Sequence, residues 1–339
     1  MKHGITILIV FMYTLGFSIE KIPETPFTEY RFNAAECKLI QHHQSRIFIP
    51  SFAFYLDGKL YHGDVVLKYR EFVDQLDLIL NNIPMAYQEN GKQHVLESAG
   101  MFEFLAYGNG KLLSFAPAKK AQVQLATAFN MTGGETFILN RQTNTWRKDT
   151  PFASLSESNR EIGDDSNALW PENIWNDAVN NDEIFDSSGN TNVAMSSSNS
   201  NTLSFETLSN QAFKTLNVDK MEVYNCDKIL TGETIPILAD FNLQGFKQAL
   251  HSPVYVVYKN RNAVLTYFPE QFKSDFKLIA NEDFTIFTFS MDGKIAVLDN
   301  AFAANFDAKN YRNKTVLFPL KVFAKAPNTK EELAKITGL

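Results

Sequence analysis

Residues 104–115 read FLAYGNGKLLSF, in which an Asn-Gly pair separates two runs of mostly apolar residues. Asn-Gly and Asp-Gly pairs supply the positive φ angles that the type I′ turn of a tight β-hairpin requires. In a hairpin with this pair at its turn, Tyr107 lies opposite Leu112 and Phe104 lies opposite Phe115. The stretch therefore predicts two antiparallel strands joined by a two-residue turn.

The same turn pattern, followed each time by lysine, recurs along the chain. It occurs at Asp57-Gly58, Asn90-Gly91 and Asp292-Gly293. The cross-strand neighbours that these turns predict are Tyr55 with Leu60, Phe289 with Ala296, and Phe287 with Leu298. Hairpins in both halves of the chain are typical of antiparallel β-sheets.

Other patterns support the same fold class. Further short strands are predicted at residues 122–127, 254–258 and 263–268. Residues 71–80 have apolar residues at helical spacing, but residues 78–80 fit a buried strand equally well. Thr329 and Glu332 form a capping-box pattern that opens a short C-terminal helix. The sequence predicts a mainly β fold with two antiparallel β-sandwich-like domains.

Composition places the chain among ordinary globular proteins. It has 339 residues, 45% hydrophobic and 21% charged, which is enough for two domains that each bury a core. The net charge of −6 argues against nucleic acid as the main partner. The two cysteines, Cys37 and Cys226, exclude a disulfide-rich scaffold and a multi-cysteine zinc site. We interpret them as buried free thiols, with a disulfide between the two halves as the alternative.

One segment differs sharply in composition. Residues 155–210 contain ten acidic residues against one basic residue, Arg160, and are rich in serine and asparagine. Such a segment buries too little apolar surface to offset the entropy of ordering it. We therefore predict a polar, partly disordered linker, most clearly at residues 186–201. The predicted division is a first domain at residues 27–152, the linker at 153–210 and a second β-rich domain at 211–339.

Within this linker, Pro171 opens a short predicted helix near residues 171–179. Trp170, Ile174 and Trp175 give that region apolar side chains in otherwise polar surroundings. Large aromatic side chains favour burial against a partner. Two interpretations stay open: the helix packs on a β domain of the same chain, or it is a recognition element that becomes ordered on an external partner. These three residues are the candidate docking or partner-binding residues.

The N-terminus carries an export signal pattern. Lys2 and His3 precede an apolar-rich run at residues 5–17, and the small residues Gly16 and Ser18 lie at its end. This is the layout of a secretory signal peptide at residues 1–18, cleaved after Ser18. The alternative is an uncleaved membrane anchor, but the run is shorter than the ~20 residues that a span needs. The sequence predicts an exported chain with no transmembrane span after cleavage.

The sequence lacks local motifs for catalysis and cofactor binding. The nearest nucleophile-elbow match, LESAG at residues 96–100, lacks the first glycine and is interpreted as a β-turn or the start of a strand. Of the histidines at 42, 43, 62 and 94, the adjacent pair points to opposite faces of a strand and cannot share a metal ion. Phosphate-loop, dinucleotide and calcium-loop patterns are also missing. We assign no catalytic, cofactor-binding or metal-binding residues.

The chain also contains an ordered series of short motifs. SRIFIP at residues 45–50 and Ala53-Phe54 are followed by GDVVLKYREF at 63–72, IPM at 83–85 and ESAGMFE at 97–103. This series resembles ZU5-like β-sandwich domains, and a group of uncharacterised exported proteins of Gram-negative bacteria that carry one. The second half resembles their partner domain at residues 223–227, 261–264 and 292–297. Over residues 31–150 and 219–339, the resemblance implies a fold and an export route, and it implies no activity.

Two details limit and support this resemblance. Some ZU5 proteins cleave themselves at a His-Phe-Ser motif, but Thr288 stands in place of the histidine before Phe289-Ser290. Self-cleavage is therefore not carried over. Independently of the resemblance, alternation predicts four sandwich-core positions: Ile47, Ile49, Val65 and Leu67.

These observations favour a non-enzymatic exported protein that binds an envelope or extracellular protein or glycan. Sandwich domains present end loops and strand edges that serve as recognition surfaces. The alternative is an extracytoplasmic hydrolase acting on glycan or peptide, because catalytic carboxylate pairs leave no local signature in a sequence. A concave site with two facing carboxylates or a Ser-His pair would favour the enzyme.

Overall fold

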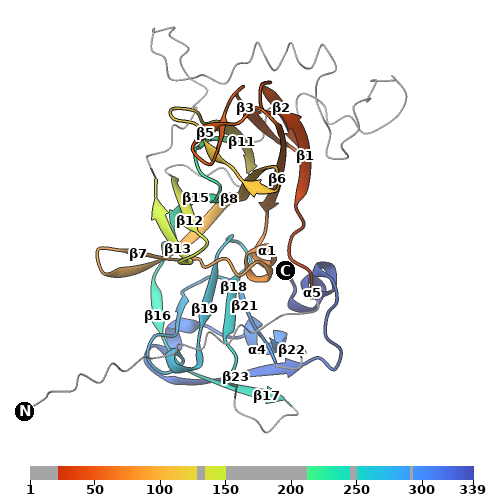
Figure 1. Ribbon diagram of the computed structural model, residues 1–339. Helices are drawn as coiled ribbons and strands as arrows, with labels where there is room; N and C mark the ends of the chain where they lie inside the picture. Colours follow the sequence, from red (N-terminus) through yellow and green to blue (C-terminus); the bar gives the residue numbers. More distant parts are fainter. Residues whose placement is uncertain (1–21, 128–133, 150–211, 245–249, 291–292) are drawn as a thin grey trace, which may run out of the picture.

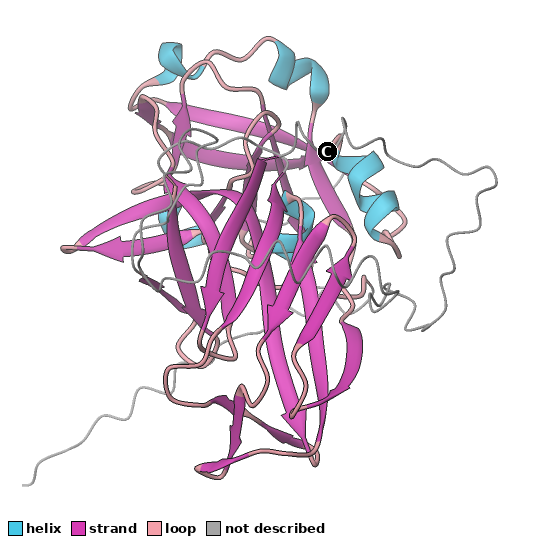
Figure 2. Ribbon diagram, turned by 90° about the horizontal axis from the view of Figure 1, so that it is seen from above, coloured by secondary structure: helices cyan, strands magenta, loops and turns pink. Residues whose placement is uncertain are grey.

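A computed structural model of the chain describes residues 22–127, 134–149, 212–244, 250–290 and 293–339. Within these residues the fold is mainly β, as predicted (Figure 1). Figure 2 shows that strands make up most of the fold and that the helices are short. No helix of the described part is both long enough and apolar enough to cross a membrane.

The elements fall into two parts along the chain. The first part contains β1 (Thr28–Asn33), β2 (Lys38–His42), β3 (Ser45–Ile49), β4 (Phe54–Leu56), β5 (Lys59–Leu60), β6 (Asp64–Phe72), α1 (Gln75–Leu80), β7 (Ala86–Glu89), β8 (Lys92–Gly108), β9 (Lys111–Leu112), β10 (Ser114–Phe115), β11 (Ala121–Thr127), β12 (Glu135–Asn140), β13 (Thr145–Lys148), β14 (Ala212–Val218) and β15 (Val223–Ile229). The second part contains β16 (Thr234–Pro236), β17 (Leu238–Gln244), β18 (Val254–Tyr258), β19 (Val264–Tyr267), η1 (Pro269–Gln271), β20 (Lys277–Ile279), β21 (Phe284–Phe289), β22 (Ile295–Leu298), α4 (Asn300–Ala304), η2 (Ala308–Tyr311), β23 (Thr315–Val322) and α5 (Lys330–Thr337).

Two sheets of the first part form a β-sandwich. One sheet has the strand order β1-β6-β8-β15-β12-β13 and the other the order β14-β11-β3-β2, and their side chains share one core. Ile47, Ile49, Val65 and Leu67 are fully buried in that core, which confirms their predicted positions. Successive side chains of a strand point to opposite faces, so each of these alternating pairs reaches the interior.

The second part is built on a six-stranded sheet with the order β17-β23-β22-β21-β18-β19. Its pairs are antiparallel except for the parallel pair of β17 and β23. Both faces are buried. Phe287 and Val297 pack on one side with α1 and α5, whereas Ile286 and Leu298 pack on the other side with β16, β20 and the short helices.

Helices α1 and α5 join the two parts. Their shared core contains Ile22, Phe72, Phe287 and Leu333. At the start of α5, Lys330 Nζ lies 2.6 Å from Asp77 Oδ1 and 2.8 Å from Asp74 Oδ2, both on or next to α1. The first described residues and the C-terminal helix therefore meet at the same helix, between the sandwich and the six-stranded sheet (Figure 1).

Three of the predicted turns are confirmed as two-residue hairpin turns. At Asp57-Gly58, Asn90-Gly91 and Asn109-Gly110, every residue has φ between 50° and 78°. The predicted neighbours Tyr107 and Leu112 are paired, and so are Tyr55 and Leu60. Asn and Asp tolerate this left-handed region better than other residues with side chains, and glycine adopts it without a steric penalty.

The prediction that Phe104 pairs with Phe115 is wrong. Phe104 pairs with Tyr69 of β6, and Phe115 pairs with Phe54 of β4. The ladder that starts at this turn ends after Leu112, because β10 joins a separate three-stranded sheet. The rings of Phe104 and Phe115 still lie 5.9 Å apart in the core.

The predicted register of the fourth hairpin is also wrong, by one residue. Phe289 pairs with Ile295, and Phe287 pairs with Val297. Ser290 N donates to Lys294 O at 2.8 Å, and Gly293 N donates to Ser290 O at 2.9 Å. Three residues therefore lie between Ser290 and Lys294, whereas the prediction assumed a turn of two residues.

The sheets divide the chain at a different point from the predicted boundary at residue 211. Strand β14 pairs with β11, and β15 lies between β8 and β12, so both strands belong to the sandwich. The signal segment at 1–18, the linker at 153–210 and its helix near 171–179 lie outside the described residues. The arrangement of the described sheets places the division after β15.

Four local predictions have outcomes in the structure. Residues 78–80 are helical and belong to α1. The C-terminal helix is confirmed, with Thr329 Oγ1 accepting from Glu332 N at 3.2 Å. Residues 96–100 lie inside β8 and form no turn. Cys37 and Cys226 are free thiols and do not form a disulfide, but Cys226 is buried and Cys37 is exposed, which corrects half of that prediction.

Candidate functional site

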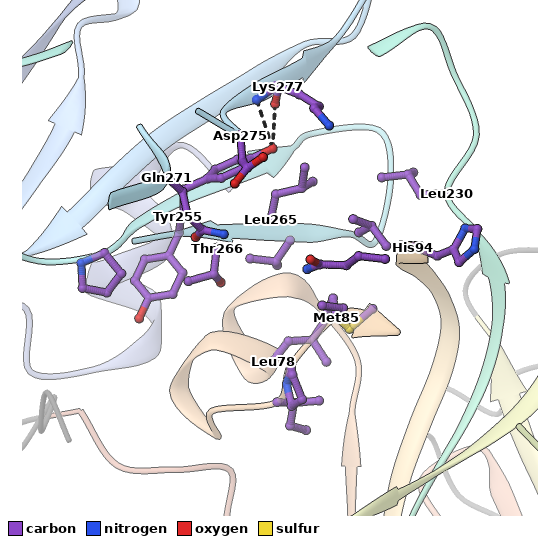
Figure 3. A pocket seen from close by; sticks show the side chains of 18 of the residues that line it. Leu78, Met85, His94, Leu230, Tyr255, Leu265, Thr266, Gln271, Asp275 and Lys277 are labelled. Carbon is purple, nitrogen blue, oxygen red and sulfur yellow. Dashed lines mark hydrogen bonds between the residues drawn. The ribbon is translucent and has the colours of Figure 1, made fainter. Parts of the chain in front are cut away.

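A groove of about 820 Å³ lies where the two parts meet (Figure 3). One wall is formed by α1, the loop after it and the β7–β8 hairpin. The other wall is formed by β19, η1 and β20, and the loop between β15 and β16 completes the lining. Ligand pockets commonly have volumes of about 300–1,000 Å³ and form between domains. This groove is therefore the candidate functional site.

Direct hydrogen bonds hold the two walls in place. Gln75 of α1 donates from Nε2 to Arg261 O at 2.7 Å and to Tyr258 O at 3.2 Å. Ser98 N of β8 donates to Asn262 O at 2.9 Å. These bonds attach the loop between β18 and β19 to the first part, so they define where β19 lies relative to α1.

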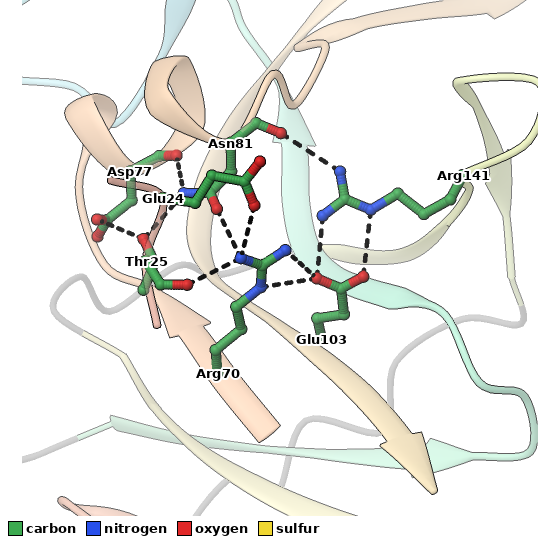
Figure 4. A network of polar contacts seen from close by, with 7 residues as sticks. All are labelled: Glu24, Thr25, Arg70, Asp77, Asn81, Glu103 and Arg141. Carbon is green, nitrogen blue, oxygen red and sulfur yellow. Dashed lines mark hydrogen bonds and ion pairs between the residues drawn. The ribbon is translucent and has the colours of Figure 1, made fainter. Parts of the chain in front are cut away.

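A buried polar network supports α1 from the side of the sandwich (Figure 4). Arg70 lies 2.7 Å from Glu103 Oε2, and it donates to Asn81 Oδ1 at 2.8 Å and to Thr25 O at 2.8 Å. Arg141 lies 3.0 Å from the same carboxylate oxygen and donates to Asn81 O at 3.4 Å. Buried guanidinium groups need such partners. Because Asn81 caps α1, the network fixes the end of this helix.

Apolar side chains from distant segments meet in the groove. Leu78 and Met85 come from α1 and the loop after it, Leu265 comes from β19, and Leu230 follows β15 (Figure 3). Leu78 and Met85 are buried, whereas Leu265 is half-buried. Covering apolar surface is favourable in water, so this lining favours apolar groups on a ligand.

Several polar side chains of the lining remain available to a ligand. His94, Tyr255, Thr266 and Lys277 form no side-chain hydrogen bond or ion pair with another residue of the described ranges. Burial raises the pKa of Tyr255, so its hydroxyl keeps its proton and can donate. Tyr267 differs, because its hydroxyl donates to Lys277 O at 2.9 Å and accepts from Lys277 N at 3.2 Å.

The chemical groups of the described lining can be compared with those that hydrolysis uses. Among the residues that line the groove, Asp275 is the one carboxylate and His94 the one histidine, and serine is not represented. Glycoside hydrolysis uses two carboxyl groups on either side of the scissile bond, and serine hydrolysis uses a Ser-His pair. The described lining brings neither pair together, but it combines apolar surface with unpaired polar groups that can orient a ligand.

A separate cluster of titratable groups lies between the two sheets of the sandwich. Glu71 Oε1 accepts from Tyr69 Oη at 2.9 Å, and Ser45 also bonds to this carboxyl. Burial raises the pKa of Glu71 to about 7. Tyr30 Oη and His42 Nδ1 are 2.8 Å apart, and burial lowers the pKa of His42 to about 4. Glu71 is thus bonded to Tyr69 and Ser45, and Tyr30 to His42, so these groups affect the stability of the sandwich.

Ser98, in the motif nearest to a nucleophile elbow, has a structural role. Its Oγ donates to Asn225 Oδ1 at 2.7 Å, and Asn225 Nδ2 in turn bonds to Asp227. All three side chains are buried. Burial raises the pKa of Asp227 well above the usual value of an aspartate. Ser98 also bonds to the Asp227 carboxyl, so its hydroxyl belongs to a buried network of three side chains.

The predicted docking residues Trp170, Ile174 and Trp175 lie outside the described residues. Within the described ranges, no three His, Cys, Asp or Glu side chains gather closely enough to hold a metal ion. Sequence reasoning missed the groove. Its one local signal was Phe268, an aromatic residue that ends a predicted strand, precedes Pro269 and is 46% exposed. Comparison with protein-family models found no match for the chain, and comparison with curated proteins found none either.

Proposed function

We propose that the chain is an exported, non-enzymatic protein that binds an envelope or extracellular partner in the groove between its two parts. The observation that carries this proposal is the groove itself, with its apolar lining and its unpaired polar groups. A lining of this kind provides both affinity and orientation. The groups that binding requires, apolar surface and polar side chains that can orient a ligand, are both present among the described lining residues, so the groove supports binding as the function.

Export is part of the proposal, and the sequence pattern at residues 1–18 supports it. Ile22, the first described residue, already lies in the shared core, and cleavage after Ser18 leaves it in the mature chain. N-terminal sequencing of the native protein should begin near Ile19. Recovery of Met1 on most of the material would contradict export.

We further propose that the sandwich is ZU5-like. Two of the motifs that carry this resemblance, at residues 45–50 and 63–72, lie largely on β3 and β6, whose alternating side chains fill the sandwich core. This supports the resemblance by position, while the order of the motifs supports it by sequence. Comparison of the strand order with an experimental ZU5 sandwich tests it, and a different order of the strands carrying these motifs would overturn it.

Capture from an envelope extract of the source organism tests the binding proposal. The immobilised wild-type chain is compared with Thr266→Glu, which places a charge in the groove at an exposed position. Leu317→Glu is the matched control, because Leu317 is 56% exposed on β23 of the same sheet and does not line the groove. We expect a component that wild type and the control retain and that Thr266→Glu loses.

Two results would contradict the binding proposal. One is a set of retained components that is the same for all three proteins, because the groove would then not be the binding site. The other is release of cleaved peptide or sugar from the extract by the wild-type chain, lost in a groove variant, because this would establish the hydrolase alternative.

A further inference from the structure

Strand β19 forms one edge of the six-stranded sheet, and its residues line the groove. Within the described ranges, β19 pairs with β18 alone. In an antiparallel pair, alternate residues bond to the partner strand, so the others direct their backbone N–H and C=O groups away from it. All four residues of β19, Val264–Tyr267, line the groove. This wall therefore carries main-chain donors and acceptors that no described strand uses.

Strand β19 is short, but it lacks the charged side chains and the proline that often protect a strand edge. Such edges carry charged side chains, proline or a bulge, which prevent pairing with another chain. Strand β19 reads VLTY, with no charge and no proline. The opposite edge strand, β17, carries Asp240, which forms an ion pair with Lys273 at 2.5 Å. The two edges of the sheet thus differ, and the one in the groove is chemically open to pairing.

The surroundings of β19 suit an extended, uncharged chain. Thr266 and Phe268 are exposed, and the apolar Leu78 and Met85 belong to the facing wall. Asp275 and Lys277 carry opposite charges and lie together on one side of the groove (Figure 3). The charges of Asp275 and Lys277 therefore cancel, and the lining has no net charge from carboxylate and ammonium groups. A peptide segment without charged side chains suits such a lining.

We propose that the groove binds an extended, uncharged peptide segment of a protein partner, which adds to β19 as a further strand. This inference rests on the proposed function and names the class of ligand for the same site. Main-chain hydrogen bonds to β19 supply affinity, and the groove walls contact alternate side chains of the segment. A glycan does not present amide donors and carbonyl acceptors at the strand repeat of about 3.3 Å, so the open edge favours a peptide.

A peptide library screened on the full chain tests this inference. The probe is a phage-displayed library of random linear peptides, selected on wild type and counter-selected on Thr266→Glu. Each recovered peptide is synthesised unmodified and in two forms that carry N-methyl groups on one or the other alternating set of amides. We expect methylation of one set to weaken binding by about tenfold or more, because an added strand bonds through alternate amides, and methylation of the other set to have little effect.

The controls separate this inference from the proposed function. The unmodified peptides should bind Leu317→Glu as they bind wild type, and circular dichroism should show that Thr266→Glu is folded. Equal effects of the two methylated sets would overturn strand addition while leaving the groove as a binding site. Failure to recover any peptide that depends on Thr266 would also overturn the inference, whereas the capture experiment decides the proposed function independently.

Discussion

Arg70 shows what a single buried charge does in this protein. Its guanidinium lies 2.7 Å from Glu103 Oε2, donates to Asn81 Oδ1 at 2.8 Å and lies 4.1 Å from the centre of the Phe27 ring. The cost of removing both charges from water offsets most of their attraction. The network therefore contributes little net stability as a whole. Its specific effect is to hold α1, and with it one wall of the groove, in a single arrangement.

Glu71 predicts a pH dependence of stability. Its pKa is raised to about 7 in the folded chain from a usual value of 4.5, mainly by burial. The folded state therefore binds the proton more tightly than the unfolded state, and the associated stability is lost as the pH rises from about 4.5 through 7. Glu71→Gln keeps an acceptor for Tyr69 and removes this titration. We expect the stability of the variant relative to wild type to rise by about 2 kcal/mol between pH 5 and pH 9.

Urea unfolding at several pH values measures this effect. His42 also titrates in the cluster, but its lowered pKa reduces stability as the pH falls from about 6.5 toward 4, and this contribution is present in both proteins. The control is Glu36→Gln, at an exposed position, whose pH profile should follow that of wild type. Parallel profiles for wild type and Glu71→Gln would show that Glu71 titrates normally.

At the scale of single elements, local sequence patterns correctly predicted hairpin turns and a helix cap, because neighbouring residues determine these features. Asn90-Gly91 and Asn109-Gly110 form the expected turns because both residues adopt positive φ. Thr329 caps α5 as expected because its hydroxyl accepts from a free backbone N–H of the first turn. The register around Asp292-Gly293 could not be predicted, because a three-residue loop also ends in glycine and shifts every pair by one residue.

The groove could not be predicted in the same way. Leu78 and Leu265 face it from positions far apart in the sequence, and no local pattern relates them. Whether β19 is an edge strand depends on the order of all six strands in its sheet, which the pattern of one strand does not contain. The strand itself was predicted at residues 263–268 and lies at Val264–Tyr267. The sequence thus indicated the strand, whereas the groove that the strand lines depends on how the sheets assemble.

At the scale of the whole molecule, the acidic segment does not separate two independent units. Leu216 of β14 and Tyr224 of β15 follow that segment, yet both lie in the core of the sandwich. A second core, containing Phe72, Phe287 and Leu333, spans the sandwich, the six-stranded sheet and α5. The chain before the segment therefore completes its sheets with strands from the chain after it.

Limited proteolysis distinguishes this arrangement from two separable domains. The composition of residues 186–201 makes them the expected site of first cleavage. A division at residue 211 predicts two fragments that separate and fold on their own. The strand pairing predicts instead that the cut chain gives two bands on a denaturing gel, elutes from a sizing column as one species and unfolds in one transition. The physical reason is that loss of β14 and β15 would expose to water the edges of β11, β8 and β12 that they pair with. If the two fragments separate in native buffer, these strand pairs do not hold the two halves of the chain together.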